Sequence, residues 1–296
     1  MITIFAVPKK FEGHISIIQR NAILSWMNLE PRPEIILLGQ DEGVSSFASE
    51  HGLEHIKGVA TNSHGTPLIS DIFEKAQRVA KHDILAYVNA DIILMRGFLE
   101  AIAAIKVSPF LMVGRRRDLD LKEPITFERT DWEDNLKKRV AQEGKLHGFS
   151  GIDYFVFTKG CFGEIPPFAI GRTSWDNWLL HRAWSRGASL IDATKVVTIV
   201  HQNHTYFHHP QGKVGVWKGE EAKINLKLAG GLANLFSIRD ADFTLTESGL
   251  EKKKIDFYRI FSLPFRYFKK SSSFLKPLLF PGYLFFVLWR KIKISK

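Results

Sequence analysis

The chain contains almost no cysteine: among its 296 residues, Cys161 carries the only thiol. One cysteine excludes an intramolecular disulfide, and no charged and then apolar leader precedes a small-residue cleavage site. Both absences favour a reducing, cytoplasmic location. Long hydrophobic runs are also missing from the apolar C-terminal segment, where the longest uncharged run, Pro277 to Trp289, is shorter than the roughly 20 residues that span a bilayer.

The first 250 residues carry no net charge. Residues 251–296 contain twelve Lys or Arg and two acids, so the whole formal charge of +10 lies there, and residues 1–250 have 29 basic and 29 acidic residues. A nucleic-acid-binding domain usually has its basic patch on a folded face, so this balance argues against a nucleic-acid partner. With no internal repeat and no long Gly- or Ser-rich linker, we predict one catalytic unit over residues 1–250 and a distinct tail.

The tail, residues 251–296, mixes aromatic and aliphatic side chains with Lys and Arg. Its apolar run is broken by Pro281 and Gly282, while Tyr283 and Trp289 are suited to the headgroup level of a membrane. This pattern predicts a basic apolar anchor that lies on an anionic membrane surface rather than crossing it. The alternative is a C-terminal helix packed on the body or on a partner.

Short apolar strands alternate with helical patterns along the body. This alternation predicts an α/β fold, with a mainly parallel Rossmann-like sheet covered by helices on both faces. Residues 118–149 are polar and interrupt the alternation, which predicts a loop and helix insertion near the substrate side. The expected strands are 2–8, 34–39, 53–56, 83–94, 110–116 and 151–160, and the expected helices are 14–29, 41–52, 68–81, 97–105 and 171–187.

A polar step, Asn89-Ala90-Asp91, interrupts the apolar central strand. Burying an ionised Asp without a partner costs several kcal/mol, so Asp91 is expected at the strand's exit, facing a cleft where a metal ion or hydrogen-bond donors compensate its charge. Open α/β sheets bind their ligands at this edge. The plainer alternative is that Asn and Asp only form a turn or cap the next helix.

A second polar site lies between two tryptophans. Asp176 stands between Trp175 and Trp178 at the start of a helical pattern, where it can act as a general base on an acceptor hydroxyl while one indole offers a flat face to a sugar ring. As an alternative, Ser174 or Asp176 only caps the helix and the tryptophans belong to the core.

Four histidines follow a later apolar strand, within residues 192–209. His201 and His204 at the strand's exit have the chemistry to complete a metal site begun by Asp91. Their spacing is not a zinc signature and no cysteines accompany them. A hard cation, Mn²⁺ or Mg²⁺, is therefore expected.

Two further groups are open to more than one interpretation. Asp153 and Tyr154 interrupt an apolar segment and can hydrogen-bond sugar hydroxyls, or form a buried pair that serves only the fold. The three arginines 115–117 can meet phosphate or lie in a solvated loop.

Taken together, the strand–helix order, the Asn-Ala-Asp step, the segment 151–157, Ser-Trp-Asp-Asn-Trp and Ile-Val-His-Gln-Asn-His resemble bacterial GT-A fold glycosyltransferases of the family-2-like group, in the nucleotide-diphospho-sugar transferase superfamily. The Asn89-Ala90-Asp91 step resembles their D-x-D motif, with Asn in place of the first Asp. The resemblance covers roughly residues 2–250. It implies a nucleotide-binding half over about 1–115, an acceptor-binding half over 116–250, and a divalent cation that assists departure of the nucleoside diphosphate.

The resemblance also implies roles for individual residues. Asn89 and Asp91 are expected near the ribose, diphosphate and metal, Asp176 at the acceptor hydroxyl, and His201 as the preferred additional ligand, with His204 as the other candidate. A carboxylate that activates the attacking hydroxyl implies an inverting enzyme, although the same residue can orient an acceptor in a retaining one. The remaining donor-binding candidates are Ala6, Val7, Pro8, Asp41, Asn62, Gly65 and Thr66, of which the last three can also be plain turn residues.

These expectations describe a peripheral-membrane glycosyltransferase that moves a sugar from a nucleoside diphosphate sugar to a hydroxyl of a glycan or glycolipid. Two other functions stay open. One is a non-catalytic, membrane-attached scaffold that binds sugar or nucleotide. The other is a sugar nucleotidyltransferase, which the sequence favours less because no Gly-rich loop with Arg and Lys follows the first strand.

Overall fold

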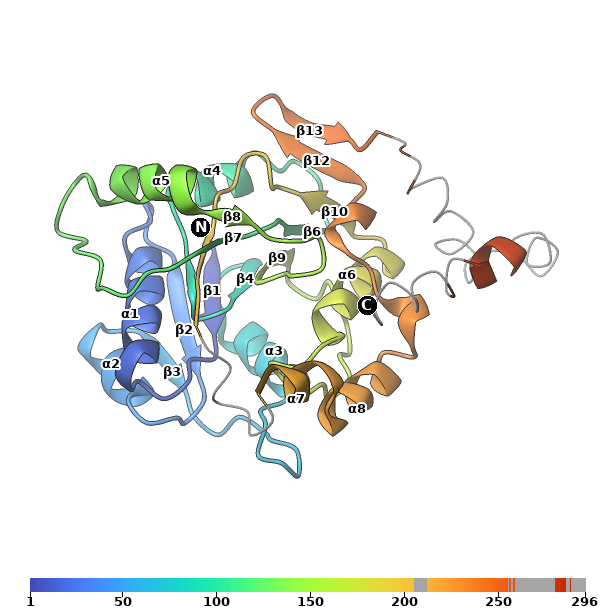
Figure 1. Cartoon of the computed structure of the whole chain (residues 1–296), viewed down its shortest axis with the longest axis horizontal. Helices are drawn as coiled ribbons and strands as arrows, with labels where there is room; N and C mark the ends of the chain where they lie inside the picture. The colour runs from blue at the N-terminus through green and yellow to red at the C-terminus, as the bar shows by residue number, and fades with distance from the viewer. Residues whose placement is uncertain (205–211, 255, 257, 259–279, 286–287, 289–296) are drawn as a thin grey trace.

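The computed structural model describes residues 1–204, 212–254, 256, 258, 280–285 and 288, and every structural statement below concerns these residues (Figure 1). Its main feature is a sheet with the strand order β13-β12-β10-β6-β9-β4-β1-β2-β3. Five of the eight neighbouring pairs are parallel; β9 runs antiparallel between β4 and β6, and β13 runs antiparallel to β12 at one edge. The strands are β1 (Thr3–Ala6), β2 (Glu34–Leu38), β3 (Glu54–Ile56), β4 (Ile84–Val88), β6 (Phe110–Val113), β9 (Tyr154–Thr158), β10 (Ser189–Asp192), β12 (Phe243–Thr246) and β13 (Gly249–Lys252).

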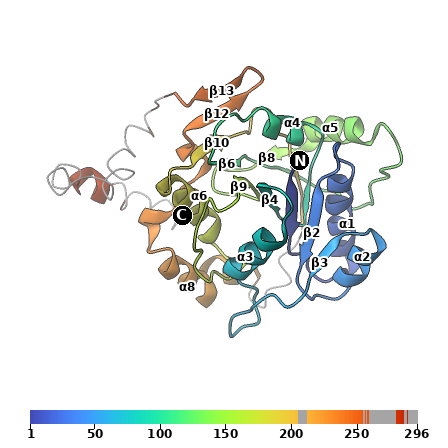
Figure 2. The ribbon, with the colours of Figure 1, turned by 180° about the vertical axis from the view of Figure 1, so that it is seen from behind.

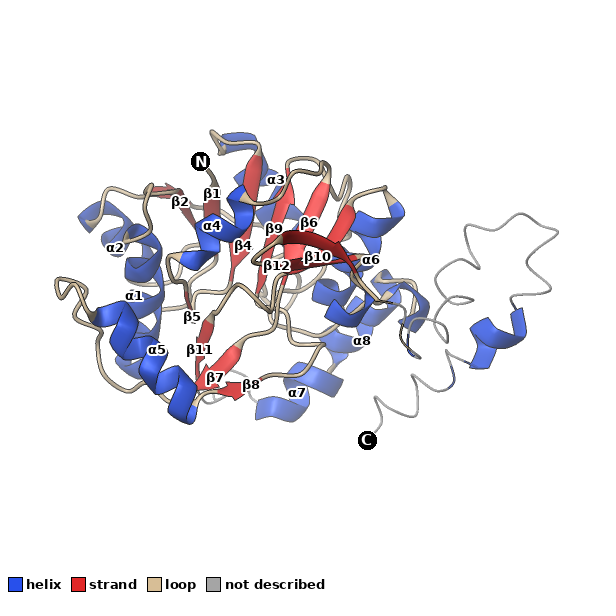
Figure 3. Cartoon of the chain, turned by 90° about the horizontal axis from the view of Figure 1, so that it is seen from above, coloured by secondary structure: helices blue, strands red, loops and turns tan. Residues whose placement is uncertain are grey.

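Helices cover both faces of this sheet (Figure 2, Figure 3). On one face lie α1 (Gly13–Met27), α2 (Val44–Glu50) and α4 (Gly97–Ala103), and on the other lie α3 (Ile69–Val79) and α6 (Trp175–Ser185). The prediction of a mainly parallel α/β sheet with helices on both faces is confirmed. The remaining helices are α5 (Trp132–Glu143), α7 (Gly212–Lys218), α8 (Glu220–Leu228) and the 3₁₀ turns η1 (Leu232–Asn234) and η2 (Ile238–Asp240).

The central strands are buried on both sides, which explains their near-continuous apolar sequences. In β1, Phe5 belongs to the core under α3 and α6, whereas its neighbour Ile4 belongs to the core under α1 and α4. Phe5 packs edge-on against Tyr87 of β4 at 5.5 Å, and Tyr87 stacks on Phe73 of α3 at 5.5 Å between ring centroids. This packing holds the carboxyl ends of β1 and β4 in fixed positions.

A second, four-stranded sheet lies beyond those carboxyl ends. Its order is β5 (Ile92–Ile93), β11 (Val200–Gln202), β7 (Arg117–Leu119) and β8 (Lys145–Leu146). The expectation of one continuous strand over residues 83–94 is wrong, because β4 ends at Val88 and the chain turns before β5. The indole of Trp26 donates a hydrogen bond to Ile92 O (2.8 Å), and β5 pairs with β11 instead of extending the large sheet.

Buried polar side chains of α1 attach this small sheet to the body. The amide of Asn21 donates to Gln202 Oε1 (3.0 Å), and Gln202 Nε2 donates to Ile18 O (2.9 Å) and Asp91 O (3.2 Å). Ser25 Oγ accepts from Leu94 N at 3.0 Å. Each bond satisfies a polar group that would otherwise be costly to bury, so the backbone on both sides of the Asn-Ala-Asp turn is tied to α1.

The insertion over residues 118–149 contains α5, as expected for a loop and helix, and also contributes β8 and most of β7 to the small sheet. At the other end of the body, β13 extends to Lys252, two residues past the predicted boundary at 250. The division into two halves and a tail stays a prediction.

Only part of the tail lies within the described residues. Tyr258 donates a hydrogen bond to Asp240 Oδ2 (3.0 Å), and Tyr258 and Tyr283 both pack against the core under α3 and α6. Within the described residues, none of the helices has the length and apolar character that crossing a bilayer requires. Trp289 lies outside the described residues, so its predicted place at the headgroup level has no structural counterpart here.

Candidate active site

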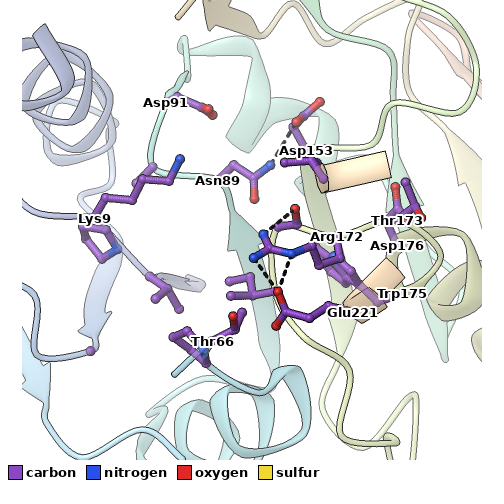
Figure 4. Close-up of a pocket in the computed structure, with 18 of the residues that line it drawn as sticks. Lys9, Thr66, Asn89, Asp91, Asp153, Arg172, Thr173, Trp175, Asp176 and Glu221 are labelled. Carbon is purple, nitrogen blue, oxygen red and sulfur yellow. Dashed lines mark hydrogen bonds and ion pairs between the residues drawn. The ribbon is translucent and has the colours of Figure 1, made fainter. Parts of the chain in front are cut away.

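A cavity of about 1170 Å³ opens at the carboxyl ends of the parallel strands (Figure 4). Val7 follows β1, Gly39 follows β2 and Asn89 follows β4, and all three line it. The first turn of α6 and the start of α8 form the opposite wall. The cavity therefore occupies the edge of the sheet where α/β proteins of this type bind ligands.

Three potential metal ligands converge in this cavity from different elements. Asp91 follows the Asn-Ala-Asp turn, His201 lies on β11 and His204 comes shortly after β11. One ligand atom from each lies within 4.8 Å of the others: Asp91 Oδ2 is 3.1 Å from His204 Nε2 and 3.5 Å from His201 Nε2. His208 and His209, the other two histidines of the predicted cluster, lie outside the described residues.

The electrostatics of this cluster favour a positive charge beside Asp91 and Asp118. Burial alone would raise the pKa of Asp91, but the charges and hydrogen bonds of His201 and His204 outweigh burial and hold that pKa well below its usual range. Burial would lower the pKa of His201, yet Asp91 and Asp118 raise it to about 10. Asp91 Oδ1 is buried and has no hydrogen-bond partner among the described residues. One carboxylate and two imidazoles are a donor set that first-row divalent metals accept.

A network of charged groups lies behind the three ligands. Asp118 on β7 is 3.2 Å from His201 Nδ1, accepts from Arg116 Nε at 2.7 Å, and is 2.7 Å from His147 Nδ1. Arg116 NH1 also donates to both carboxylate oxygens of Asp153 at 2.8 Å. Burial would lower the pKa of Arg116, but Asp153 and Asp118 raise it above its ordinary value. Arg116 is thus bound to two carboxylates, and its contact with phosphate stays a prediction.

Asp153 connects this network to the Asn-Ala-Asp turn. Asn89 Nδ2 donates to Asp153 Oδ1 (2.9 Å), and the backbone N–H of Asn89 donates to Asp153 O (2.9 Å). These bonds use the donor groups of Asn89 and turn its side-chain oxygen into the cavity, as Figure 4 shows. Asn at this position can donate to a carboxylate, which an ionised Asp could not do.

Asp176 lies in the first turn of α6, on the wall opposite Asn89. It borders the cavity, but its Oδ1 atom is buried with no hydrogen-bond partner among the described residues. Burial, helped by the charge of Asp153, raises the pKa of Asp176 to about 7, although backbone hydrogen bonds from Asn177, Asp176 and Ser174 oppose the shift. A carboxyl with a pKa near 7 in a cavity is suited to accept a proton at neutral pH.

The turn that delivers Asp176 is conformationally unusual. Ser174, the residue before α6, has a φ of 87°, and it is the one non-glycine residue with positive φ in the described chain. Such a conformation costs on the order of 1–3 kcal/mol and is often found where surrounding structure fixes a functional group. Here it directs the first turn of α6, with Trp175 and Asp176, at the cavity.

Lys9 contributes a cation from the first loop. Its backbone is fixed by the buried side chain of Gln19, which accepts from Lys9 N (2.5 Å) and donates to Lys9 O (2.9 Å). In Figure 4 the amine extends toward Asp91 and Asn89. Burial lowers the pKa of Lys9, while the charge of Asp91 opposes the change.

An ion pair closes the far side of the cavity. Glu221 of α8 binds Arg172 NH2 at 2.6 Å and accepts from Asn62 Nδ2 at 2.7 Å, so three separate segments meet at one carboxylate. Burial would raise the pKa of Glu221, but the hydrogen bonds from Thr66, Asn62 and Arg172 outweigh it and lower the pKa. Glu221 therefore holds α8 against the loop that contains Thr66.

Most of the predicted site residues line this one cavity, whereas four do not. Ala6 is fully buried within β1, and Asn62 binds Glu221 behind the wall. Tyr154 packs on Phe98 at 5.6 Å, on the opposite face of the sheet from Trp175. Trp178 packs against Phe168 at 5.3 Å and does not line the cavity, whereas Trp175 does. The predicted residues that line it are Val7, Pro8, Asp41, Gly65, Thr66, Asn89, Asp91, Asp153, Trp175, Asp176, His201 and His204.

Five residues of the site were not predicted from the sequence. Lys9 and Arg172 carried no motif signal, and Glu221 lies in an ordinary amphipathic helix. Asp118 and His147 belong to the insertion, where only the pairing of β7 with β8 and β11 brings them together. No pattern in the sequence indicates that pairing.

The sequence matches no known family model and no curated protein. Among solved structures, the chain is similar to Staphylococcus aureus TarS 1–349 in complex with UDP, with a TM-score of 0.51 at 10% identity over 95% of this chain and 78% of that one. Two further similar structures are TarS 1–349 by itself (TM-score 0.46, 10% identity, 68% of this chain) and GalNAc-T7 with UDP, GalNAc and Mn²⁺ (TM-score 0.49, 14% identity, 78% of this chain). The chain spans 60% of the former and 48% of the latter.

These structural neighbours are GT-A glycosyltransferases, and the similarity to the TarS–UDP complex confirms the predicted GT-A fold. Since the identity is only 10%, the similarity concerns the fold.

Proposed function

We propose that this protein is a glycosyltransferase that transfers a sugar from a nucleoside diphosphate sugar to a hydroxyl acceptor. One observation carries the proposal: Asp91, His201 and His204 converge in the same cavity as Asp176, at the carboxyl edge of a GT-A sheet. The first three are suited to hold a cation and the fourth to accept a proton. The presence of UDP in the TarS 1–349 structure of the same fold supports a nucleotide donor.

The donor is placed along the strand ends. Val7, Pro8 and Asp41 form the wall nearest β1 and β2, where the nucleoside would lie, and Thr66 borders it from the loop before α3. The side-chain oxygen of Asn89 faces the same space and can accept from a ribose hydroxyl. The diphosphate then lies between Asn89, Asp91 and the amine of Lys9.

Asp91, His201 and His204 would hold a divalent cation, which supplies charge stabilisation to the departing nucleoside diphosphate. Mn²⁺ is favoured over Mg²⁺, because two of the three ligands are imidazoles and Mg²⁺ prefers oxygen donors. Lys9 adds a second positive charge on the nucleotide side of the cavity.

Asp176 acts on the acceptor. As the acceptor oxygen forms its bond to the anomeric carbon, its proton passes to the Asp176 carboxylate, and the bond from that carbon to the diphosphate breaks with its electron pair leaving on the nucleoside diphosphate. Attack from the Asp176 side, opposite the diphosphate, inverts the anomeric centre. Trp175 offers a flat surface beside Asp176 for a sugar ring.

Asp153 has a supporting role in this scheme. It is 5% exposed and bound to Arg116 and Asn89, so it orients those groups in preference to a predicted contact with sugar hydroxyls. The acceptor side is then formed by Trp175, Asp176 and the loop around Ser150 and Gly151.

The proposal includes attachment to an anionic membrane surface, on the cytoplasmic side, through the tail. Support comes from the twelve basic residues of residues 251–296 and from exposed apolar side chains in the described part, Phe280, Leu284, Phe285 and Leu288. A glycan or glycolipid acceptor follows from that position. Removal of residues 259–296 leaves β13 and Tyr258 in place, and is expected to abolish co-sedimentation with vesicles containing anionic lipid; unchanged co-sedimentation would refute the attachment.

Turnover on a panel of nucleoside diphosphate sugars, measured as nucleoside diphosphate release with and without Mn²⁺, tests the reaction. We expect Mn²⁺-dependent release from one donor, lost in Asp91→Asn and in Asp176→Asn. The matched control is Asp83→Asn, an exposed carboxylate outside the cavity. Donor binding without any transfer or hydrolysis would favour the scaffold, and release of pyrophosphate from a nucleoside triphosphate and a sugar phosphate would favour a nucleotidyltransferase.

A further inference from the structure

In the small sheet, Asp118 on β7 lies next to His201 on the neighbouring strand β11. In the parallel pairing of β11 with β7, His201 and Asp118 are partners in register. On the other side of β11, His201 pairs with Ile92, the residue after Asp91. His201 therefore lies between the strand that follows Asp91 and the strand that carries Asp118.

We propose that Asp118 is the positioning residue that orients the His201 imidazole toward the cation site. Its carboxylate lies 3.2 Å from His201 Nδ1, while the opposite ring nitrogen, Nε2, faces Asp91 at 3.5 Å. With Nδ1 beside Asp118, Nε2 is the ring nitrogen that faces Asp91 and the proposed cation site. At 3.2 Å the two atoms are within ion-pair distance, although their alignment is not that of a hydrogen bond.

The contacts of Asp118 fit a positioning role rather than direct contact with substrate. Asp118 is not among the residues that line the cavity, whereas its three contacts Arg116, His147 and His201 do line it. Arg116 Nε and His147 Nδ1, both at 2.7 Å, hold its two oxygens. The carboxylate is thereby held from two sides, and the oxygen bound by Arg116 is also the one that lies 3.2 Å from His201 Nδ1.

The same network reaches the other end of the cation site. Arg116 also binds both oxygens of Asp153, and Asp153 accepts from Asn89, two residues before Asp91. Asp118 and Asp153 are therefore joined by one guanidinium. This connection fixes the spacing between the Asn-Ala-Asp turn and β11, on which the ligand geometry depends.

Carboxylates that hold a metal-bound histidine from behind usually contribute about 10–100-fold in metal affinity. The inference rests on the proposed cation site, so its test measures the cation directly. Mn²⁺ is titrated into the full-length protein without donor, and bound and free ions are separated by electron paramagnetic resonance. Asp118→Asn keeps the shape but loses the charge, and is expected to weaken Mn²⁺ binding about 10–100-fold.

Two further variants separate positioning from folding. Asp118→Glu restores the carboxylate and should recover part of the affinity. Asp131→Asn removes a different carboxylate that is also bound by an arginine, Arg129 at 2.9 Å, outside the cavity, and should leave Mn²⁺ binding unchanged. Circular dichroism melts of all three variants show whether any loss comes from unfolding.

The outcomes are distinct. Native affinity in a folded Asp118→Asn variant overturns the positioning role while the proposed function stands. Equal losses in Asp118→Asn and Asp131→Asn also overturn it, since the effect would then not depend on His201. Absence of Mn²⁺ binding in the native protein refutes the cation site and this inference together.

Discussion

Asp91 Oδ2 lies 3.1 Å from His204 Nε2, although 113 residues separate them in the chain. The contact exists because β5 and β11 pair directly after the Asn-Ala-Asp turn. The other oxygen of Asp91 is buried and has no hydrogen-bond partner among the described residues. This relationship leads to the first prediction.

His204→Ala is expected to lower Mn²⁺ affinity at least about 10-fold, because it removes one of two imidazole ligands. Mg²⁺, which relies less on imidazole, should lose proportionally less. Calorimetric titration with each ion checks both statements. His14→Ala, at an exposed position of α1 outside the cavity, is the control, and an equal loss there would contradict a specific site.

The transfer rate should depend on the ionisation of Asp176. Its pKa is raised to about 7, and only the deprotonated carboxylate can accept the acceptor's proton. At saturating substrate, the rate should therefore rise as pH increases through about 7 and then level off. The residual activity of Asp176→Asn should lack this ascending limb; a profile that is unchanged in that variant would exclude Asp176 as the base.

Asp176 should also make the fold less stable at high pH. A carboxyl whose pKa is higher in the folded than in the unfolded chain binds its proton more tightly when folded, so its stabilising contribution is full below about pH 4 and is lost as pH rises through about 7. Asp176→Asn should thus raise the free energy of unfolding at pH 8 by an amount on the order of 3 kcal/mol. Urea unfolding at pH 5 and pH 8 measures it, and a larger gain at pH 5 would contradict the account.

Glu221 should matter for both stability and donor binding. Glu221→Gln weakens the buried pair with Arg172, and we expect a loss of about 1.5–3 kcal/mol in unfolding free energy with a raised KM for the donor. Glu143→Gln is the matched control: its pair with Arg139 is half exposed and should contribute about 0.3–0.5 kcal/mol. Similar effects of the two substitutions would show that Glu221 does not support the cavity wall.

The sequence predicted six of the nine strands of the large sheet, because most of them are buried and read as apolar runs, but it did not predict β10, β12 and β13. Of these three, β12 and β13 are only partly buried. The run from Ile84 to Leu94 misled at one point, since apolar residues on both sides of Asn89-Ala90-Asp91 look like one strand. What ends β4 is not a local signal but the pairing of Ile92 and Ile93 with β11, more than 100 residues later. Periodicity cannot show such non-local pairing.

The candidate site, too, contains residues that a local sequence signal predicted and residues that had no such signal. Asp91 and the two histidines were predicted because a polar residue at the end of an apolar strand is costly without a purpose, and Asp176 because it stands between two tryptophans at the start of a helical pattern. Tyr154 and Trp178, two candidates for acceptor contacts, do not line the cavity, because alternation along β9 and one helical turn in α6 direct them elsewhere. Lys9, Asp118 and Glu221 gave no local signal, since their positions depend on which elements meet in three dimensions.

The central claim is that Asp91 binds the donor through a cation, while Asp176 accepts the proton of the acceptor hydroxyl that attacks the same donor. Isothermal titration of a panel of nucleoside diphosphate sugars with Mn²⁺ into the native protein, Asp91→Asn and Asp176→Asn tests it most directly. We predict that one donor binds the native protein and Asp176→Asn with similar affinity, and that Asp91→Asn loses the Mn²⁺-dependent part of that binding. Equal donor affinity of native protein and Asp91→Asn in the presence of Mn²⁺ would contradict the claim.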